Sequence, residues 1–285
     1  MKTSSLKFKI IVAVSLGIIV LAASNTFFQI READRQLDQA VQGLADGANQ
    51  EFSNLLTGEL SRLSLAIESL LKDEQAVAAF ARRDRESLAQ RHAELYDRMR
   101  NEYGIAQYHW HVPPATSFFR FHNTANFDDD LSGFRATVVA TNRNQQPIRG
   151  LEVGRGGPGV RIVYPVFYEG DHQGSVEMGG SINSLLQRLE DNLGIFYAVG
   201  IDPDIFRAVG RFADGTEDVL RDGLQYYRFS SDQARLLTEQ AESLSGVTDF
   251  EETQVALSTI ELLDYQDRQI GQIVVGADIS ALMSA

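Results

Sequence analysis

The first hydrophobic pattern along the chain is an apolar run near its N-terminus. Positions 10–30 form a run of 21 residues without a charge, beginning IIVAVSLGIIVLAA. In a helix this run would be about 31 Å long, which matches the hydrocarbon core of a bilayer. Lys2, Lys7 and Lys9 precede it, and basic flanks stay on the cytoplasmic side of a membrane. We therefore predict a cytoplasmic tail over 1–9, a single-pass inner-membrane anchor over 10–30, and an extracytoplasmic location for 31–285.

The same run leaves one alternative open. Ala22, Ala23 and Ser24 are the kind of small residues that precede a signal-peptide cleavage site, so a cleaved signal would also fit. The uncharged run continues past that site to Ile30, which favours a retained anchor. Under both interpretations the folded part of the chain is exported.

Beyond Arg31, apolar residues recur every three or four positions, apart from one longer step. This spacing predicts one long amphipathic helix to about Leu71 with a single buried stripe. The glycines within it each cost such a helix up to ~1 kcal/mol relative to alanine, so packing must support it. A second helical stretch is expected from 84 to 101, ending by Gly104. The stripe consists of Leu37, Val41, Leu44, Ala48, Phe52, Leu55, Leu63, Ile67 and Leu70.

After Gly104 the chain changes to short runs rich in β-branched and aromatic residues, separated by clusters of Gly, Pro, Asn and Asp. Such runs are typical of strands and turns, so we expect a mixed α+β region. The expected strands are 105–112, 117–122, 147–152, 160–168, 174–180 and 195–201, followed by a terminal hairpin of 255–265 with 271–277. The expected helices are 134–142, 183–192 and 231–243.

Two stretches of this region match each other. Tyr103-Gly104-Ile105 opens the first, and Leu193-Gly194-Ile195 opens the second. Near the two ends, glycine, glycine and isoleucine recur with the same spacings, as Gly174, Gly179 and Ile182 and again as Gly271, Gly276 and Ile279. Matched starts and ends predict two copies of one module. We place stalk helices at 31–102, a membrane-distal module at 103–183 and a membrane-proximal module at 184–285.

The most distinctive motifs lie in the first of these modules. They are Tyr108-His-Trp-His-Val-Pro-Pro, Ser117-Phe-Phe-Arg-Phe-His, Phe127-Asp-Asp-Asp-Leu, Gly150-Leu-Glu-Val-Gly-Arg-Gly-Gly-Pro-Gly and Tyr164-Pro-Val-Phe-Tyr. Together with the long helix and the tandem modules, they resemble the double Cache domains of bacterial sensor kinases, chemoreceptors and cyclic-di-GMP signalling proteins.

The resemblance covers about residues 31–285. It implies an α+β fold with two tandem PAS-like modules, each an antiparallel sheet with flanking helices. It also implies that the membrane-distal module binds the ligand. The second membrane span and the output domains that the resemblance implies lie outside this sequence.

The balance of charge narrows the range of partners. The chain has 39 acidic and 26 basic residues, a formal net charge of −13. Nucleic-acid binding needs a basic face that displaces counterions from phosphates, so we expect no nucleic-acid partner. The chain has no cysteine, which excludes disulfides, thiolate metal sites and cysteine nucleophiles.

Three histidines and an arginine form the main candidate binding site. Alternate residues of a strand share a face, so His109 and His111 should point the same way, as should Arg120 and His122. If the two strands pair across the Pro113-Pro114 turn, these side chains meet. Arg120 could then grip a carboxylate or phosphate beside tunable imidazole donors. Two alternatives stay open, a zinc site made of the three imidazoles and a polar face without a ligand.

A second charged group, which also contains Arg155, follows on the later strands. A pocket wall is one interpretation, and a cross-strand Glu152–Arg161 ion pair, worth at most ~1 kcal/mol where exposed, is the other. The predicted ligand-binding residues are therefore His109, His111, Arg120, His122, Glu152, Arg161 and Glu177, with no metal and no cofactor assigned.

Other motifs argue against catalysis. Residues 154–159 match G-x-G-x-x-G, but a β-rich run follows them, so a hairpin turn is the better interpretation. Asp128-Asp129-Asp130 lacks the spacing of a calcium loop and is expected in a solvated loop that could cap the 134–142 helix. The sequence has no G-x-S-x-G elbow, no P-loop and no H-E-x-x-H helix. We predict that the chain is not an enzyme.

The expected function is therefore the sensing of a small molecule, with an anion favoured by Arg120 and Arg161. Binding would select one of two packings and move the stalk or a terminal helix after Gly276. The stalk stripe is expected to pair with its copy in a parallel homodimer. Two alternatives come from other classes: an anchored solute-binding protein without signalling output, and a metal-dependent hydrolase built on the histidines.

Overall fold

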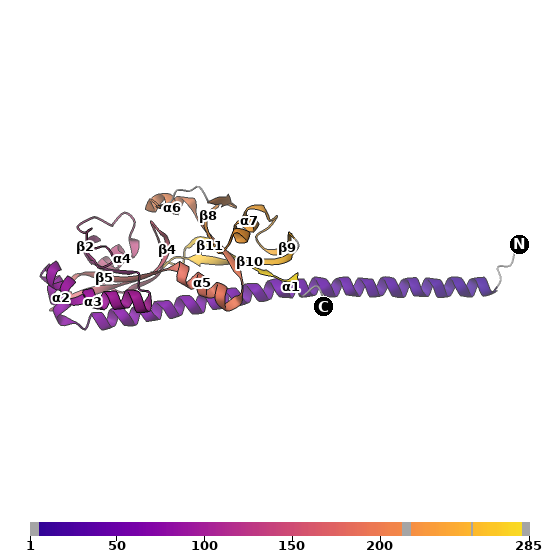
Figure 1. The fold of residues 1–285 in the computed structure, drawn as a ribbon, viewed down its shortest axis with the longest axis horizontal. Helices are drawn as coiled ribbons and strands as arrows, with labels where there is room; N and C mark the ends of the chain where they lie inside the picture. Colours follow the sequence, from indigo (N-terminus) through magenta and orange to yellow (C-terminus); the bar gives the residue numbers. More distant parts are fainter. Residues whose placement is uncertain (1–5, 213–217, 252, 281–285) are drawn as a thin grey trace.

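One continuous helix, α1 (Leu6–Leu70), contains both the expected membrane anchor and the first of the expected stalk helices. In the computed structural model, which describes residues 6–212, 218–251 and 253–280, α1 extends far beyond the folded part of the chain (Figure 1). Every side chain from Phe8 to Ile30 is exposed. An 18-residue window of α1 has a mean hydropathy of 2.2 and no buried residue, so this part is long and apolar enough to cross a membrane.

The other half of α1 packs on the chain's own core. Six positions of the apolar stripe are buried, and they share one core with residues of both sheets: Ala48, Phe52, Leu55, Leu63, Ile67 and Leu70. Leu37, Val41 and Leu44 are half-buried. Assigning the whole stripe to a second chain was therefore wrong for 48–70, because the two sheets already supply the apolar surface that covers it.

Two helices follow at the far end of α1. α2 (Glu74–Ala81) was not expected from the sequence, whereas α3 (Arg85–Tyr103) matches the expected 84–101 helix. Each is capped by an aspartate whose carboxylate accepts backbone N–H groups of the first turn, Asp73 for α2 and Asp84 for α3. Gly104 ends α3 with a φ of 66°, in the left-handed region that favours glycine.

The first sheet has five antiparallel strands in the order β2-β1-β5-β4-β3. β1 and β2 pair across Pro113-Pro114 as expected, and residues 154–157 form the turn of the β3–β4 hairpin, as the hairpin interpretation required. The strands are β1 (Gln107–Val112), β2 (Thr116–Arg120), β3 (Ile148–Gly154), β4 (Gly157–Tyr168) and β5 (Asp171–Ser181).

The two faces of the first sheet differ in chemistry. Side chains alternate along a strand, so Tyr108 and Trp110 of β1 lie on one face and His109 and His111 on the other. Tyr108 and Trp110 are buried in the core shared with α1, α2 and α3. The polar face is partly covered by α4 (Ala136–Asn144), whose side chains reach Val163 of β4.

The start of α4 corrects one expectation. The helix begins two residues later than expected, and its N-cap residue Arg135 makes no side-chain cap hydrogen bond. Asp129 instead binds Arg120, and Asp130 accepts the backbone N–H of Ser132 at 2.9 Å. The aspartate run therefore does not cap α4, because Asp128 pairs with Arg85 of α3, Asp129 with Arg120 of β2, and Asp130 with the loop backbone.

The second sheet has six strands in the order β7-β8-β6-β11-β10-β9. The β10–β11 pair confirms the expected terminal hairpin. Helix α6 and strands β7, β8 and β9 were not expected from the sequence. The elements are α5 (Ile182–Leu193), β6 (Phe196–Ile201), α6 (Pro203–Val209), β7 (Val219–Arg221), β8 (Leu224–Phe229), α7 (Asp232–Gln240), β9 (Gly246–Phe250), β10 (Thr253–Leu263) and β11 (Gln269–Asp278).

The two sheets confirm the repeat. In each, the first strand pairs antiparallel with the last, β1 with β5 and β6 with β11. A Cβ atom at Gly174 would collide with the carbonyl oxygen of His111, and one at Gly271 would collide with that of Gly200. Glycine recurs at this place because the backbone of the neighbouring strand comes so close. The terminal helix expected after Gly276 falls beyond Ser280, outside the described residues.

Candidate functional site

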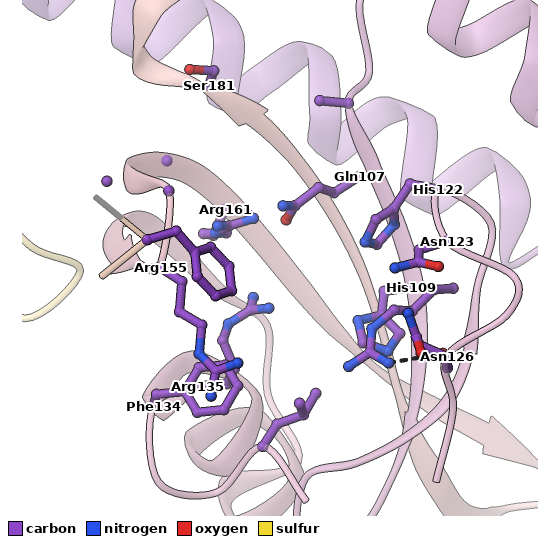
Figure 2. A pocket seen from close by; sticks show the side chains of 18 of the residues that line it. Gln107, His109, His122, Asn123, Asn126, Phe134, Arg135, Arg155, Arg161 and Ser181 are labelled. Atoms are coloured by element: carbon purple, nitrogen blue, oxygen red, sulfur yellow. Dashed lines mark hydrogen bonds between the residues drawn. The ribbon is translucent and has the colours of Figure 1, made fainter. Parts of the chain in front are cut away.

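A cavity of about 590 Å³ lies on the polar face of the first sheet. Its walls are strands of the sheet, the loop between β2 and α4, and the β3–β4 hairpin, and Phe212 of the second module completes its rim. Figure 2 shows arginines on one side of the cavity and imidazole and amide groups on the other. The first side has Arg135, Arg155 and Arg161, and the second has His109, His122, Asn123 and Asn126.

His109 and His122 supply the imidazole groups. β2 ends at Arg120 and not at 122 as expected, so His122 lies just after the strand. Its ring centroid is nevertheless 5.8 Å from that of His109. Nε2 of His109 lies 2.8 Å from the hydroxyl of Ser117, and Nδ1 of His122 lies 3.3 Å from the carbonyl oxygen of Tyr108. Burial lowers the pKa of both imidazoles, so both are neutral near pH 7 and can bind a ligand as hydrogen-bonding groups.

Arg120 faces the cavity, but its bidentate partner belongs to the chain itself. Nη1 and Nη2 donate to the two carboxylate oxygens of Asp129, each at 2.7 Å. Nη1 also donates to the carbonyl oxygen of Asn126 at 2.8 Å. These hydrogen bonds lower the pKa of Asp129. The bidentate grip expected for Arg120 therefore exists, with a protein carboxylate in the place expected for a ligand.

Arg161 occupies space that three glycines leave open. Cβ atoms at Gly154, Gly159 and Gly179 would come within 3.3, 3.2 and 2.9 Å of its guanidinium group. Nη1 of Arg161 donates to Oε1 of Glu177 at 3.2 Å. Nε of Arg161 is buried and has no partner among the described residues. A buried donor without a partner is costly, so a ligand oxygen that reached this nitrogen would be stabilised by it.

Arg135 was not identified from the sequence, although it connects the two buried glutamates. Its Nε donates to Oε2 of Glu152 at 2.9 Å, and its Nη2 donates to Oε1 of Glu177 at 2.5 Å. The backbone N–H and the hydroxyl of Thr137 also donate to Glu152. Of the two interpretations of this group, the Glu152–Arg161 ion pair is therefore wrong, because Arg135 pairs with Glu152 and Arg161 pairs with Glu177.

His111 and Glu177 lie beneath the cavity and are fully buried. Nε2 of His111 is 3.5 Å from Oε2 of Glu177. Burial lowers the pKa of His111 to about 3. Burial would raise the pKa of Glu177, but Arg135 and Arg161 together lower it to about 2. Near pH 7 the imidazole is therefore neutral and the carboxylate is ionised.

Arg155 stands at the exposed rim of the cavity. Its guanidinium carbon lies 4.6 Å from the ring centroid of Phe134 and 5.4 Å from that of Phe212. The backbone N–H of Phe212 donates to the carbonyl oxygen of Arg155 at 2.8 Å. Between residues 6 and 280, outside the gaps at 213–217 and 252, no ion pair within 4.0 Å involves Arg155. Its charge is held in place by two aromatic rings.

The lining of the cavity is basic although the chain is acidic. Its charged lining groups are Arg120, Arg135, Arg155, Arg161 and Asp129. Asp129 pairs with Arg120, and the buried glutamates pair with Arg135 and Arg161 from behind the wall. Arg155 adds a positive charge without a carboxylate partner in the described residues. This arrangement suits an anion that also has groups for hydrogen bonding to imidazoles and amides.

The seven residues predicted for the site divide into two sets. His109, Arg120, His122 and Arg161 line the cavity, whereas His111, Glu152 and Glu177 lie behind its wall. That any of them binds a ligand stays a prediction. Other lining residues were not predicted. Gln107 shares the strand alternation of His109 and was overlooked. Loops and the second module supply the others, and no local periodicity marks them: Asn123, Asn126, Asp129, Phe134, Arg135 and Phe212.

A tandem pair of antiparallel sheets on one long helix, with a polar cavity in one of them, is the arrangement that the resemblance to double sensory domains implied. Residues 41–283 match the dCache_3 family, described as the double sensory domain of two-component sensor kinases. The chain belongs to this family, as its resemblance to double Cache domains implied.

Solved structures of sensor domains are similar to this chain. The sensor domain of the Vibrio cholerae histidine kinase DctB has a TM-score of 0.52 and 11% identity, covering 87% of this chain and 98% of that chain. The periplasmic domain of Vibrio cholerae LuxQ has a TM-score of 0.48 and 9% identity, covering 81% and 98%.

A third structure is the ligand-binding domain of the Pseudomonas aeruginosa amino acid chemoreceptor PctB in complex with L-Arg. Its TM-score is 0.46 and its identity 11%, covering 88% of this chain and 99% of that chain. TM-scores below 0.5 establish no shared fold, and the DctB match establishes the fold alone. The search of curated proteins finds no similar sequence.

Proposed function

We propose that this sensory domain binds a small anionic solute in the cavity of the first module, which lies distal to the membrane. The observation that carries the proposal is the set of guanidinium groups around the cavity. Nε of the buried Arg161 has no hydrogen-bond partner, and Arg155 has no carboxylate partner in the described part of the chain. An anion placed between them and the two imidazoles would satisfy both.

A thermal-shift screen of the full chain in detergent tests this proposal. The panel contains carboxylates, phosphates, amino acids, amines and purines. A ligand at a hundred times its Kd adds about 2.7 kcal/mol of stability, which gives a visible rise in Tm. We expect shifts with anions and none with simple amines. Arg155→Ala should remove most of the shift, and Arg143→Ala, an exposed arginine of α4 outside the cavity, should leave it unchanged.

Two results would contradict the proposal. One is a screen in which amines and no anions shift the unfolding of the chain. The other is an anion-induced shift that survives unchanged in Arg155→Ala and in His122→Gln, since it would place the anion elsewhere on the chain.

The hairpin wall of the cavity gives a route from the ligand to the second module. A Cβ at Gly157 would lie 2.7 Å from the hydroxyl of Tyr227, a residue of β8. The backbone N–H of Tyr265 donates to the carbonyl oxygen of Leu151 at 3.0 Å. A ligand that pulls Arg155 would shift this hairpin against the second sheet. Both sheets pack on α1, so that helix would carry the change to the membrane.

The proposal includes the orientation of the chain across the membrane. With 1–9 in the cytoplasm and 10–30 in the inner membrane, residues 31–285 lie outside. The first sheet packs at the end of α1 that is remote from the apolar segment (Figure 1), which supports 103–183 as the distal module and 184–285 as the proximal one. The parallel homodimer is proposed for the part of α1 before Ala48, where the domain leaves Leu37 and Val41 half-buried.

One observation favours a second candidate function. The apolar stripe of α1 from Ala48 to Leu70 is buried against the chain's own core. The same burial would be expected in an anchored solute-binding protein that transmits no signal. Sedimentation of the full chain in detergent, with and without ligand, separates the candidates. A dimer supports the signalling proposal, and a monomer in both states supports the solute-binding alternative.

A further inference from the structure

A buried cluster beneath the cavity floor combines two imidazoles and a carboxylate. One ligand-type atom from each of His109, His111 and Glu177 lies within 4.8 Å of the other two. The imidazole ring centroids are 3.9 Å apart. All three side chains are at most 2% exposed. The sequence alone suggested His122 as the third member, but β5 brings Glu177 opposite His109 instead.

Two atoms of this cluster are buried without any partner. Nε2 of His111 and Oε2 of Glu177 make no hydrogen bond in the described part of the chain, and they face each other across 3.5 Å. Both guanidinium groups that bind Glu177 use its other oxygen, Oε1. Two buried polar atoms without partners call for an explanation, and a metal ion bound by both of them is one.

The second nitrogen of each imidazole is already engaged. The hydroxyl of Ser117 lies 2.8 Å from Nε2 of His109, and that of Ser175 lies 3.4 Å from Nδ1 of His111. Partners of this kind fix the tautomer and the ring orientation of a metal-binding histidine. They leave Nδ1 of His109 and Nε2 of His111 for an ion.

We propose that His109, His111 and Glu177 bind a divalent transition-metal ion, zinc being the best match to two neutral imidazoles and one carboxylate. Three protein ligands leave a tetrahedral zinc one open position. His109 also lines the cavity, which gives an ion a route to the cluster.

The test titrates zinc chloride into the full chain in detergent, after removal of any purification tag and of bound metal with a chelator. Calorimetry and elemental analysis should give one zinc per chain. His109→Gln and His111→Gln should each weaken binding by about tenfold or more, since each removes a ligand. Two controls should bind zinc as the unchanged chain does: His122→Gln, which lines the same cavity, and His172→Gln, which lies outside it.

X-ray absorption of the zinc-loaded, unsubstituted chain gives an answer that does not depend on how the variants fold. Two imidazole ligands in the spectrum support the site. The proposal is overturned if the folded chain takes up no zinc, if His109→Gln binds zinc unchanged, or if the spectrum lacks imidazole. An ordinary Nε2–H to carboxylate hydrogen bond between His111 and Glu177 would then be the correct description. None of these results depends on the anionic ligand.

Discussion

In the first module, the strand that opens the sheet carries His109 and His111 on the face away from α1, α2 and α3. At the matching positions of the second module, β6 carries Ala198 and Gly200. The match follows from the register, since Gln107 pairs with Gly179 as Phe196 pairs with Gly276. By the same register, the place of Glu177 is taken by Val274.

These residue differences make the face polar in the first module and apolar in the second. In the second module the face packs against α7 and the segment that follows it, and no space that a water molecule could occupy remains between Ala198, Leu237, Leu257 and Val274. In the first module the same face borders a cavity of about 590 Å³. Two copies of one backbone therefore differ in the space above the same face, through a few inward positions and the loops above them.

The largest difference should appear when a charge is removed from the first module. Glu177 is fully buried between Arg135 and Arg161, and breaking a buried ion pair by removing one partner costs about 3–5 kcal/mol. Glu177→Gln should lower the free energy of unfolding by that amount, measured by chemical unfolding with the fluorescence of Trp110, the only tryptophan. Glu261→Gln, an exposed carboxylate of β10, should stay within about 0.5 kcal/mol. A loss below 1 kcal/mol for Glu177→Gln, on the order of ordinary surface changes, would mean that the pair is not formed.

A substitution at the shared glycine should affect both modules alike. A Cβ at Gly174 or Gly271 would collide with the backbone of the neighbouring strand, and overpacking of this kind costs about 1–3 kcal/mol. Gly174→Ala and Gly271→Ala should each lower Tm by a similar amount. Gly43→Ala on the exposed side of α1, where a Cβ meets nothing, should raise stability by up to about 1 kcal/mol. A tolerated Gly271→Ala beside a damaging Gly174→Ala would break the equivalence of the two sheets.

Acid should destabilise the first module in particular. The pKa of folded His111 is about 3 and lies below its ordinary value of 6.5, so between these values only the unfolded chain takes up the proton. The free energy of unfolding contributed by His111 is therefore fully present above pH 6.5 and falls as pH is lowered, by at most about 1.4 kcal/mol per pH unit. Glu177, with a pKa of about 2 against 4.5, adds a loss of the same sign below pH 4.5.

The pH dependence is measured by unfolding at several pH values with Trp110 fluorescence. In His111→Gln the free energy of unfolding should fall less steeply as the pH is lowered from the ordinary histidine pKa of about 6.5 to about 5. The second module has no histidine, because none follows His172. An unchanged slope in His111→Gln would show that this imidazole does not titrate as its burial requires.

The smallest effect on stability should come from Arg155. Its side chain is exposed at the rim, and substitutions at such positions usually stay within about 0.5 kcal/mol. Arg155→Ala should therefore unfold like the unchanged chain in the absence of ligand and differ only when an anion is present. A ligand-free loss of more than about 1 kcal/mol would identify Arg155 as a structural residue of the hairpin and not a binding residue.

Much of the fold could be predicted from the sequence because its signals are local. The alternation in β1 placed His109 and His111 on one face, and the glycine spacing near Gly174 and Gly271 identified the repeat. Short elements without a strong period, such as α2, β7 and β9, gave no such signal. The stripe of α1 was visible, but periodicity shows only that a face is buried and not which surface covers it.

The site was predicted less completely for a related reason. Its strand residues follow from alternation, whereas Arg135 precedes a helix by one residue and Phe212 comes from the other module. Which carboxylate pairs with which arginine depends on three-dimensional placement. In the structure Asp129 pairs with Arg120, and Arg135 rather than Arg161 pairs with Glu152. Neither pairing can be predicted from the spacing of these residues along the chain.

Hydrogen–deuterium exchange of the full chain, with and without a saturating anion from the screen, tests most directly whether the first module alone is the ligand site. Exchange should slow in the loop 121–135 and the hairpin 154–159, which border the cavity. Exchange should stay unchanged in 241–251 of the second module, beside the face that is packed closed. Protection of 241–251 without protection of 121–135 and 154–159 would contradict this expectation.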